Sequence, residues 1–221
     1  MLLPRDFIGY LALWSAGHGG YDPRGNALAL GWLRLTYRTA VPLARRRVAP
    51  HAITALGVLV CALVPLVASF GAGWPLLAVP IIVASGLADS VDGAVALLSG
   101  RSSRFGAVLD GVADRVGEAL YLVALWLLGA PAWLCVVAGG ITWLQEYARA
   151  RAGLDDIGVV TVWERPTRIV VTAFALGFAG LAGLIAPGYV AGVVTVGTAA
   201  WVVLGAIGLA QFLLVARRRL A

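Results

Sequence analysis

Four aspartates are the residues whose type and spacing best suit chemistry. Asp89 and Asp92 lie three residues apart, and Asp110 and Asp114 lie four apart. Residues at these spacings share one face of a helix, so each pair would present its carboxylates in the same direction. Carboxylates gathered in a partly dry site repel one another and take up protons unless cations are bound. Because oxygen-only ligands select hard cations, the pattern predicts a site for Mg²⁺ or Mn²⁺ ahead of Zn²⁺.

The segment between the two pairs decides whether they can meet. It is short and contains Gly100, which predicts a tight turn between two antiparallel helices. Such a hairpin would bring all four carboxylates to the same depth. The alternative role for these acids is salt bridging, because Arg101, Arg104 and Arg115 lie close to them in the sequence.

The composition indicates what must position these side chains. The chain has 221 residues, of which 61% are hydrophobic and 13% charged, and its mean hydropathy is +0.90. These values exclude a soluble globular enzyme, a disordered chain and a disulfide-rich secreted module, and they place the chain in a bilayer. The 17 basic residues, all of them arginines, outnumber 11 acidic ones and give a net charge of +6. This balance predicts contact with anionic membrane lipids or phosphorylated substrates, and no nucleic-acid partner.

Long charge-free stretches define the predicted membrane spans. Charged residues are absent from 48–88, 119–145 and 169–216, whereas a spanning helix needs about 20 residues. Glycine and proline at 71–75 and 187–188 divide the two longest stretches. We therefore predict an all-α integral membrane bundle of six transmembrane helices. The predicted spans are 52–70, 75–98, 105–128, 131–150, 168–186 and 189–215.

The arginines indicate the orientation of these spans. They precede the first span, follow the last or lie near turns on one side, while the three opposite turns carry no charge. The positive-inside rule then places both termini and the aspartates at the cytoplasmic face, in what we expect to be a bacterial plasma membrane. We predict three regions: a cytoplasmic or interfacial segment 1–50, a six-helix membrane domain 51–216 and a basic cytoplasmic tail 217–221.

The N-terminal segment has two features of its own. The apolar run Phe7–Ala16 is short and follows a charged pair, so we expect no cleaved signal peptide. Between residues 29 and 48, Arg34, Arg38 and Arg45 recur near helical spacing beside apolar residues. This pattern predicts an amphipathic helix lying in the membrane interface. The alternative is an ordinary solvated face on a cytoplasmic extension.

The aspartate segment resembles the signature of the CDP-alcohol phosphotransferases, which runs D-x-x-D-G-x-x-A-R, then eight residues, then G-x-x-x-D-x-x-x-D. Asp89–Leu97 and Gly106–Asp114 match every fixed position except one, because Leu97 stands where the family has arginine. Pro50–Thr54 is similar to the family's P-N-x-[IL]-T segment, with His51 in place of asparagine. The resemblance covers roughly residues 45–215, and the preceding segment has no match in it.

The resemblance implies a particular reaction. Family members bind a CDP-linked lipid such as CDP-diacylglycerol at the cytoplasmic interface, where a small alcohol acceptor attacks the lipid-side phosphorus and expels CMP. Asp89, Asp92 and Asp110 would then be ligands of two Mg²⁺ or Mn²⁺ ions, with Asp114 as the general base and a further ligand. Many relatives are dimers, so a homodimer is implied as well.

The signature also implies a nucleotide site. Gly93, Ala96 and Gly106 would lie against the nucleotide, since a glycine lets a ligand approach the backbone closely. The alternative role for the two glycines is close helix packing in the membrane. Arg101 lies four residues after Leu97 and would share its helix face if the helix continued that far, so it could restore the missing charge beside the diphosphate. The competing interpretation is that Arg101 only anchors the turn.

Two further segments resemble the phosphatidylinositol-phosphate synthase branch of the family. Tyr147–Ala152 and Glu164–Arg168 match its Y-x-R-A-R-A and E-R-x-x-R patterns, although Gly153 stands where the branch usually has glutamate. In that branch the arginines bind the phosphate of the acceptor, which implies a phosphorylated polyol such as inositol phosphate or glycerol phosphate. The matching arginines are Arg149, Arg151, Arg165 and Arg168. Their alternative role is simple positive-inside anchoring.

Two other hypotheses concern the whole chain. A catalytically degenerate relative, acting as a membrane binding or scaffolding protein, is favoured by Leu97 and His51. An unrelated transporter or intramembrane aspartyl protease fits poorly, because charge stops at one face and four spaced aspartates exceed a catalytic pair.

Overall fold

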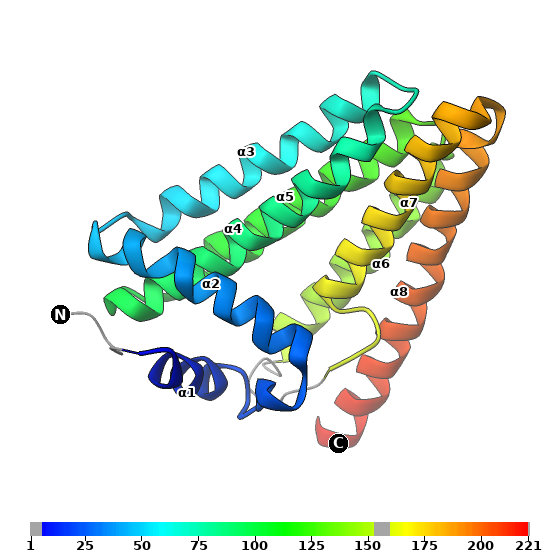
Figure 1. Cartoon of the computed structure of the whole chain (residues 1–221). Coiled ribbons are helices and arrows are strands. Elements are labelled where there is room, and N and C mark those ends of the chain that lie inside the picture. Colours follow the sequence, from blue (N-terminus) through cyan, green and yellow to red (C-terminus); the bar gives the residue numbers. More distant parts are fainter. Residues whose placement is uncertain (1–5, 153–159, 221) are drawn as a thin grey trace. The chain divides into compact units, whose positions relative to one another are not determined.

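The chain contains helices and no strand within residues 6–152 and 160–220, the part that the computed structural model describes. The α-helices are α1 (Phe7–Gly17), α2 (Ala27–Arg45), α3 (Pro50–Ser69), α4 (Ala78–Ser99), α5 (Arg104–Leu127), α6 (Ala132–Ala152), α7 (Arg165–Ile185) and α8 (Val190–Leu220) (Figure 1). The short 3-10 helices in this part of the chain are η1 (Pro23–Gly25), η2 (Trp74–Leu77) and η4 (Pro187–Tyr189). The predicted all-α class is confirmed.

A helix is present at each of the six predicted spans. Among the described residues, four continuous helical stretches are long and apolar enough to cross a membrane: Pro50–Ser69, Trp74–Ser99, Arg165–Ile185 and Pro187–Arg219. The remaining two helices, α5 and α6, have 24 and 21 residues, which is also sufficient length, but both contain charged side chains. Six crossings therefore remain a prediction, whereas the helices themselves are observed.

The turn between α4 and α5 has the geometry expected of a glycine stop. Gly100 has a φ of 66°, a left-handed conformation that favours glycine. Its N–H donates to the Leu97 carbonyl at 3.3 Å, and the N–H of Arg101 donates to the Ala96 carbonyl at 2.9 Å. Ser103 then caps the start of α5, because its hydroxyl accepts a hydrogen bond from the Gly106 N–H at 3.0 Å. The predicted hairpin is thus closed by local capping at both of its ends.

The N-terminal segment forms two capped helices. The Asp6 carboxylate accepts from Gly9 N–H at the start of α1, and the Asn26 side chain accepts from two N–H groups at the start of α2. On α2 the buried residues recur at three- and four-residue spacing, whereas its arginines are exposed. The buried residues are Leu33, Thr36, Ala40 and Ala44. An interfacial location for this two-faced helix stays a prediction.

The chain divides into two compact units. Unit 1 consists of residues up to Val58 with Ala84–Asp114, and unit 2 consists of Leu59–Val83 with the chain from Arg115. Within unit 1, side chains of α1 and α2 share an apolar core with the second half of α4. That core includes Tyr10, Leu11, Leu33, Ala40, Val91, Ala94, Val95 and Leu98. The predicted regions 1–50, 51–216 and 217–221 remain predictions.

Unit 2 has its own core and several close helix approaches. Trp201 and Trp163 are fully buried there, with ring centroids 5.3 Å apart. On α7, a Cβ added to Gly183 would lie 2.0 Å from the Ala72 carbonyl oxygen, so only glycine fits at this contact. Small residues thus allow the backbones of unit 2 to approach closely.

Candidate functional site

Three of the four aspartates meet in unit 1. Asp89 of α4 and Asp110 and Asp114 of α5 are half-buried, and each offers a carboxylate oxygen within 4.8 Å of the others. Such a group of oxygens from two helices is able to hold a divalent ion. The structure therefore brings together three of the predicted metal ligands.

Asp92 is directed to a different partner. Its carboxylate accepts a hydrogen bond of 2.5 Å from the Thr54 hydroxyl of α3, and its side chain is buried. Asp92 still lines the same cavity as Asp89 and Asp110. Sequence spacing placed it on the correct helix face but gave no sign of the threonine that holds it.

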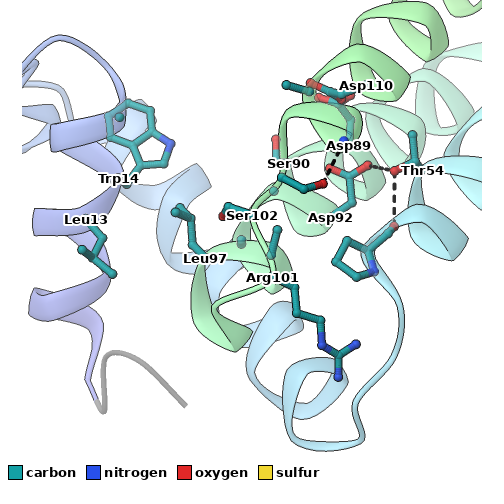
Figure 2. A pocket seen from close by; sticks show the side chains of 18 of the residues that line it. Leu13, Trp14, Thr54, Asp89, Ser90, Asp92, Leu97, Arg101, Ser102 and Asp110 are labelled. Carbon is teal, nitrogen blue, oxygen red and sulfur yellow. Dashed lines mark hydrogen bonds between the residues drawn. The ribbon is translucent and has the colours of Figure 1, made fainter. Parts of the chain in front are cut away.

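Helical periodicity explains why these residues share one cavity. Asp89, Asp92, Gly93 and Ala96 follow at spacings of three, four and seven residues from the first, which is one face of α4. On α5, Gly106 lies four residues before Asp110. The cavity between these faces has a volume of about 510 Å³ and is also lined by residues of α1, α2 and α3 (Figure 2).

The predicted nucleotide residues all line this cavity, but their surroundings differ. A Cβ added to Gly93 would meet nothing within 4 Å, so this glycine leaves open space rather than packing against another helix. At Gly106 an added Cβ would lie 3.1 Å from the Ser103 hydroxyl oxygen and 3.3 Å from Cε1 of His51. Close packing is therefore observed at Gly106 and not at Gly93. Ala96 also lines the cavity.

Arg101 lies beyond the end of the helix that carries Leu97. α4 ends at Ser99 and the chain turns at Gly100, so Arg101 does not continue the helix face of Leu97. Its Nη1 donates to the Arg47 carbonyl at 3.3 Å, and Figure 2 shows the guanidinium directed away from the labelled aspartates. Arg101 does line the cavity. Compensation for the missing arginine stays a prediction, with the turn-anchoring alternative favoured by this contact.

Two of the four predicted acceptor arginines are paired with glutamates in unit 2. Arg168 of α7 is completely buried and donates to Glu118 of α5 and Glu146 of α6. Arg149 of α6 donates to Glu164 at 2.8 Å. These pairs neutralise acids on neighbouring helices, which is a structural role that the sequence patterns did not indicate.

The other two predicted arginines have different positions. Arg151 is exposed at the end of α6, and Arg165 is half-buried at the start of α7. Gly153, where the branch usually has glutamate, lies outside the described residues. A phosphate-binding role for the four arginines stays a prediction.

Glu118 of unit 2 is a buried acid that sequence reasoning missed. It is 3% exposed and also pairs with Arg115, whose Nε lies 2.8 Å from its carboxylate. A signal was present, because Glu118 continues the four-residue spacing of Asp110 and Asp114 into an apolar span. An acid at such a position requires a partner.

Comparison with known proteins gives a consistent result. Residues 47–209 match the sequence model of a family described as CDP-alcohol phosphatidyltransferase. A curated relative, the phosphatidylinositol phosphate synthase of Streptomyces avermitilis, is 34% identical in an alignment 197 residues long that covers 79% of this chain and 77% of the relative.

Two crystal structures of the Mycobacterium tuberculosis phosphatidylinositol phosphate synthase share the fold. The one with CDP-DAG bound has a TM-score of 0.64 at 23% identity and covers 81% of this chain and 94% of its own. The one in complex with manganese and citrate has a TM-score of 0.64 at 22% identity and covers 80% and 88%.

Proposed function

The chain belongs to the CDP-alcohol phosphatidyltransferase family of phospholipid-synthesising membrane enzymes, and we propose that it transfers the phosphatidyl group of CDP-diacylglycerol to a phosphorylated polyol. The observation that carries this proposal is the meeting of Asp89, Asp110 and Asp114 within 4.8 Å of one another beside a cavity of about 510 Å³. A cavity of this volume accommodates a nucleotide.

The donor set fits hard divalent cations. The grouped ligand atoms are carboxylate oxygens only, which suits Mg²⁺ or Mn²⁺. Asp89, Asp110 and Asp114 would hold two such ions together with Asp92. When bound, the ions neutralise the diphosphate and stabilise charge on the attacking and leaving oxygens. A manganese complex of a structural neighbour supports the choice of ion.

The residues of the chain then have distinct tasks in the transfer. Asp114 accepts the proton of the acceptor hydroxyl while the hydroxyl oxygen forms a bond to the lipid-side phosphorus. The bond from that phosphorus to the bridging oxygen breaks, and CMP leaves with the electron pair. Gly93 leaves space for the nucleotide against the backbone of α4. Thr54 fixes the orientation of the Asp92 carboxylate.

Inositol phosphate is the acceptor that we propose. The curated relative from Streptomyces avermitilis is a phosphatidylinositol phosphate synthase, and the arginine segments of this chain resemble that branch. An acceptor that carries a phosphomonoester suits guanidinium groups, which offer bidentate hydrogen bonds and full charge. Glycerol phosphate is the second acceptor to be tested.

The test is transfer by the purified full chain in lipid nanodiscs. CDP-diacylglycerol is supplied with inositol phosphate, glycerol phosphate or unphosphorylated inositol, and CMP and the lipid product are measured with Mg²⁺, Mn²⁺ or EDTA. We expect CMP release with inositol phosphate and a divalent ion. Absence of CMP release with every acceptor and ion would favour the catalytically degenerate alternative.

A single substitution tests the metal site directly. Asp89→Ala removes one of the three grouped carboxylates, so both Mn²⁺ binding and ion-dependent transfer should be lost while the protein remains folded. Asp22→Ala is the matched control, because Asp22 is an exposed acid of the same unit outside the cavity. Normal transfer by Asp89→Ala in EDTA would contradict the metal assignment.

A further inference from the structure

The cavity in unit 1 has one wall that the family signature does not explain. Leu13 and Trp14 of α1 and Trp32 of α2 line the same cavity as Asp89 and Asp110. These wall residues precede residue 47, where the match to the family begins. The match to the family therefore assigns these wall residues no role.

Buried contacts hold this wall in place. Tyr10 and Leu11 of α1 are 1% and 5% exposed and share a core with Val91 and Ala94 of α4. The indole Nε1–H of Trp32 donates to the Ser90 hydroxyl at 2.9 Å. Because Ser90 lies between the first two aspartates of the motif, the wall is attached directly to the metal-binding helix.

The two ends of the cavity have different chemistry. One end carries the carboxylates, where cations and a diphosphate fit. Towards the other end, Figure 2 shows Leu13 and Trp14 of α1 across from Leu97 of α4. Gly93 and Ala96 add no polar side chain to this face of α4. His18 and Ser102 also line the cavity, and the aromatic and aliphatic side chains among these residues offer faces that suit a flat, uncharged ring.

The ring of Trp14 is already held in one orientation. It stacks on the His18 ring with centroids 3.9 Å apart and an interplanar angle of 17°, and His18 Nδ1 lies 2.7 Å from the Trp14 carbonyl oxygen. Tyr21 contacts the indole edge-on at 6.2 Å. An aromatic side chain that is fixed before binding loses little entropy when a ligand stacks on it.

We propose that Trp14 contacts the pyrimidine base of the CDP-lipid, so that α1 is part of the donor site. This inference rests on the proposed function, since the base is the one flat ring of that donor. The acyl chains are the other apolar part of the donor, and the experiment separates them from the base by using ligands that lack them.

The experiment measures binding by calorimetry with the full chain in nanodiscs containing Mn²⁺. The ligands are CDP-diacylglycerol, then CDP, which has the base and no acyl chain, and inorganic pyrophosphate, which has neither. Stacking on a base is worth enough that Trp14→Ala should weaken CDP binding by about fivefold or more. Pyrophosphate binding should stay within about twofold, because the contact concerns only the base.

Two further variants serve as matched controls. Trp14→Phe keeps an aromatic face and should retain CDP affinity within about threefold of the parent. Ile8→Ala changes a residue of α1 that is 67% exposed and does not line the cavity, so it should leave both affinities unchanged.

The possible outcomes separate this inference from the proposed function. Unchanged CDP affinity in Trp14→Ala, equal loss for CDP and pyrophosphate, or weakening of CDP-diacylglycerol alone would each overturn the base contact. The proposed function survives all three results, provided the parent still releases CMP. A parent that binds no CDP and releases no CMP overturns both.

Discussion

Asp92 differs from the other three aspartates in what its carboxylate contacts. It accepts a hydrogen bond from Thr54, whereas Asp89, Asp110 and Asp114 face one another. A hydroxyl donor stabilises a buried carboxylate, and a bound cation stabilises carboxylates that lie this close together. Sequence spacing alone predicts the same role for all four aspartates. It indicates the helix face on which each lies, but not which neighbouring helix supplies a hydrogen-bond donor.

The general base can be tested separately from ligation. Asp114→Asn keeps the shape of the side chain and one ligating oxygen but cannot accept a proton. We expect CMP release to fall by about 10²–10⁴-fold while CDP affinity changes little. Single-turnover CMP release and CDP calorimetry on the same preparation check this. Turnover within about tenfold of the parent would assign the proton to another group.

At the scale of elements, Arg168 connects three helices of unit 2 through Glu118 and Glu146. Its Nη2 also donates to the Trp163 carbonyl at 2.9 Å. Burial of a charge costs free energy unless the charge is paired, so these groups depend on one another. The same residue was predicted from sequence to bind the phosphate of the acceptor.

Arg168→Leu distinguishes the two roles. Removal of the guanidinium leaves Arg115 as the cation that Glu118 and Glu146 still share, and loss of the two buried pairs should destabilise unit 2 by up to about 3–5 kcal/mol. The measurement is the thermal unfolding midpoint in detergent, with Arg151→Leu at an exposed position as the control. A variant that unfolds like the parent but loses affinity for inositol phosphate would restore the phosphate-binding interpretation.

The start and end points of the helices were the features most easily predicted from the sequence. The helix predicted at 105–128 is observed as Arg104–Leu127, because a glycine stop before it and a serine cap define its start. The helix α1 was not expected, since its apolar run was considered only as a signal peptide. Its capping acid Asp6 was a readable signal. The pairing of Glu118 with Arg168 joins residues 50 positions apart, and no local pattern indicates it.

At the scale of the whole molecule, the number of membrane crossings is decided by α5 and α6. With six crossings and cytoplasmic termini, the α5–α6 turn and the α7–α8 turn both face outwards. With only the four most apolar stretches crossing, the α5–α6 turn stays inside. The charges on α5 and α6 lower the hydropathy of these two helices, which is why they are not among the four most apolar stretches.

Cysteine labelling in intact bacterial cells distinguishes these arrangements. Ala132→Cys, Gly188→Cys and Arg217→Cys are each made in a background lacking the native, buried Cys61 and Cys135. We expect a membrane-impermeant maleimide to label positions 132 and 188 from outside, and position 217 only after permeabilisation. Protection of position 132 would reduce the count to four, and labelling of position 217 in intact cells would reverse the orientation.

Because of the hydrogen bond from Trp32 to Ser90, the aspartate motif of this chain cannot be exchanged for that of a relative without affecting α2. Ser90 is a position that the signature leaves free, yet here its hydroxyl accepts from an indole 58 residues earlier in the chain. Threonine at this position keeps the acceptor, whereas alanine leaves the indole donor without it. A motif transplanted from a relative would therefore carry its ligands into this chain and still loosen α2. In this protein the residue at a variable position of the motif is therefore constrained by a contact with α2.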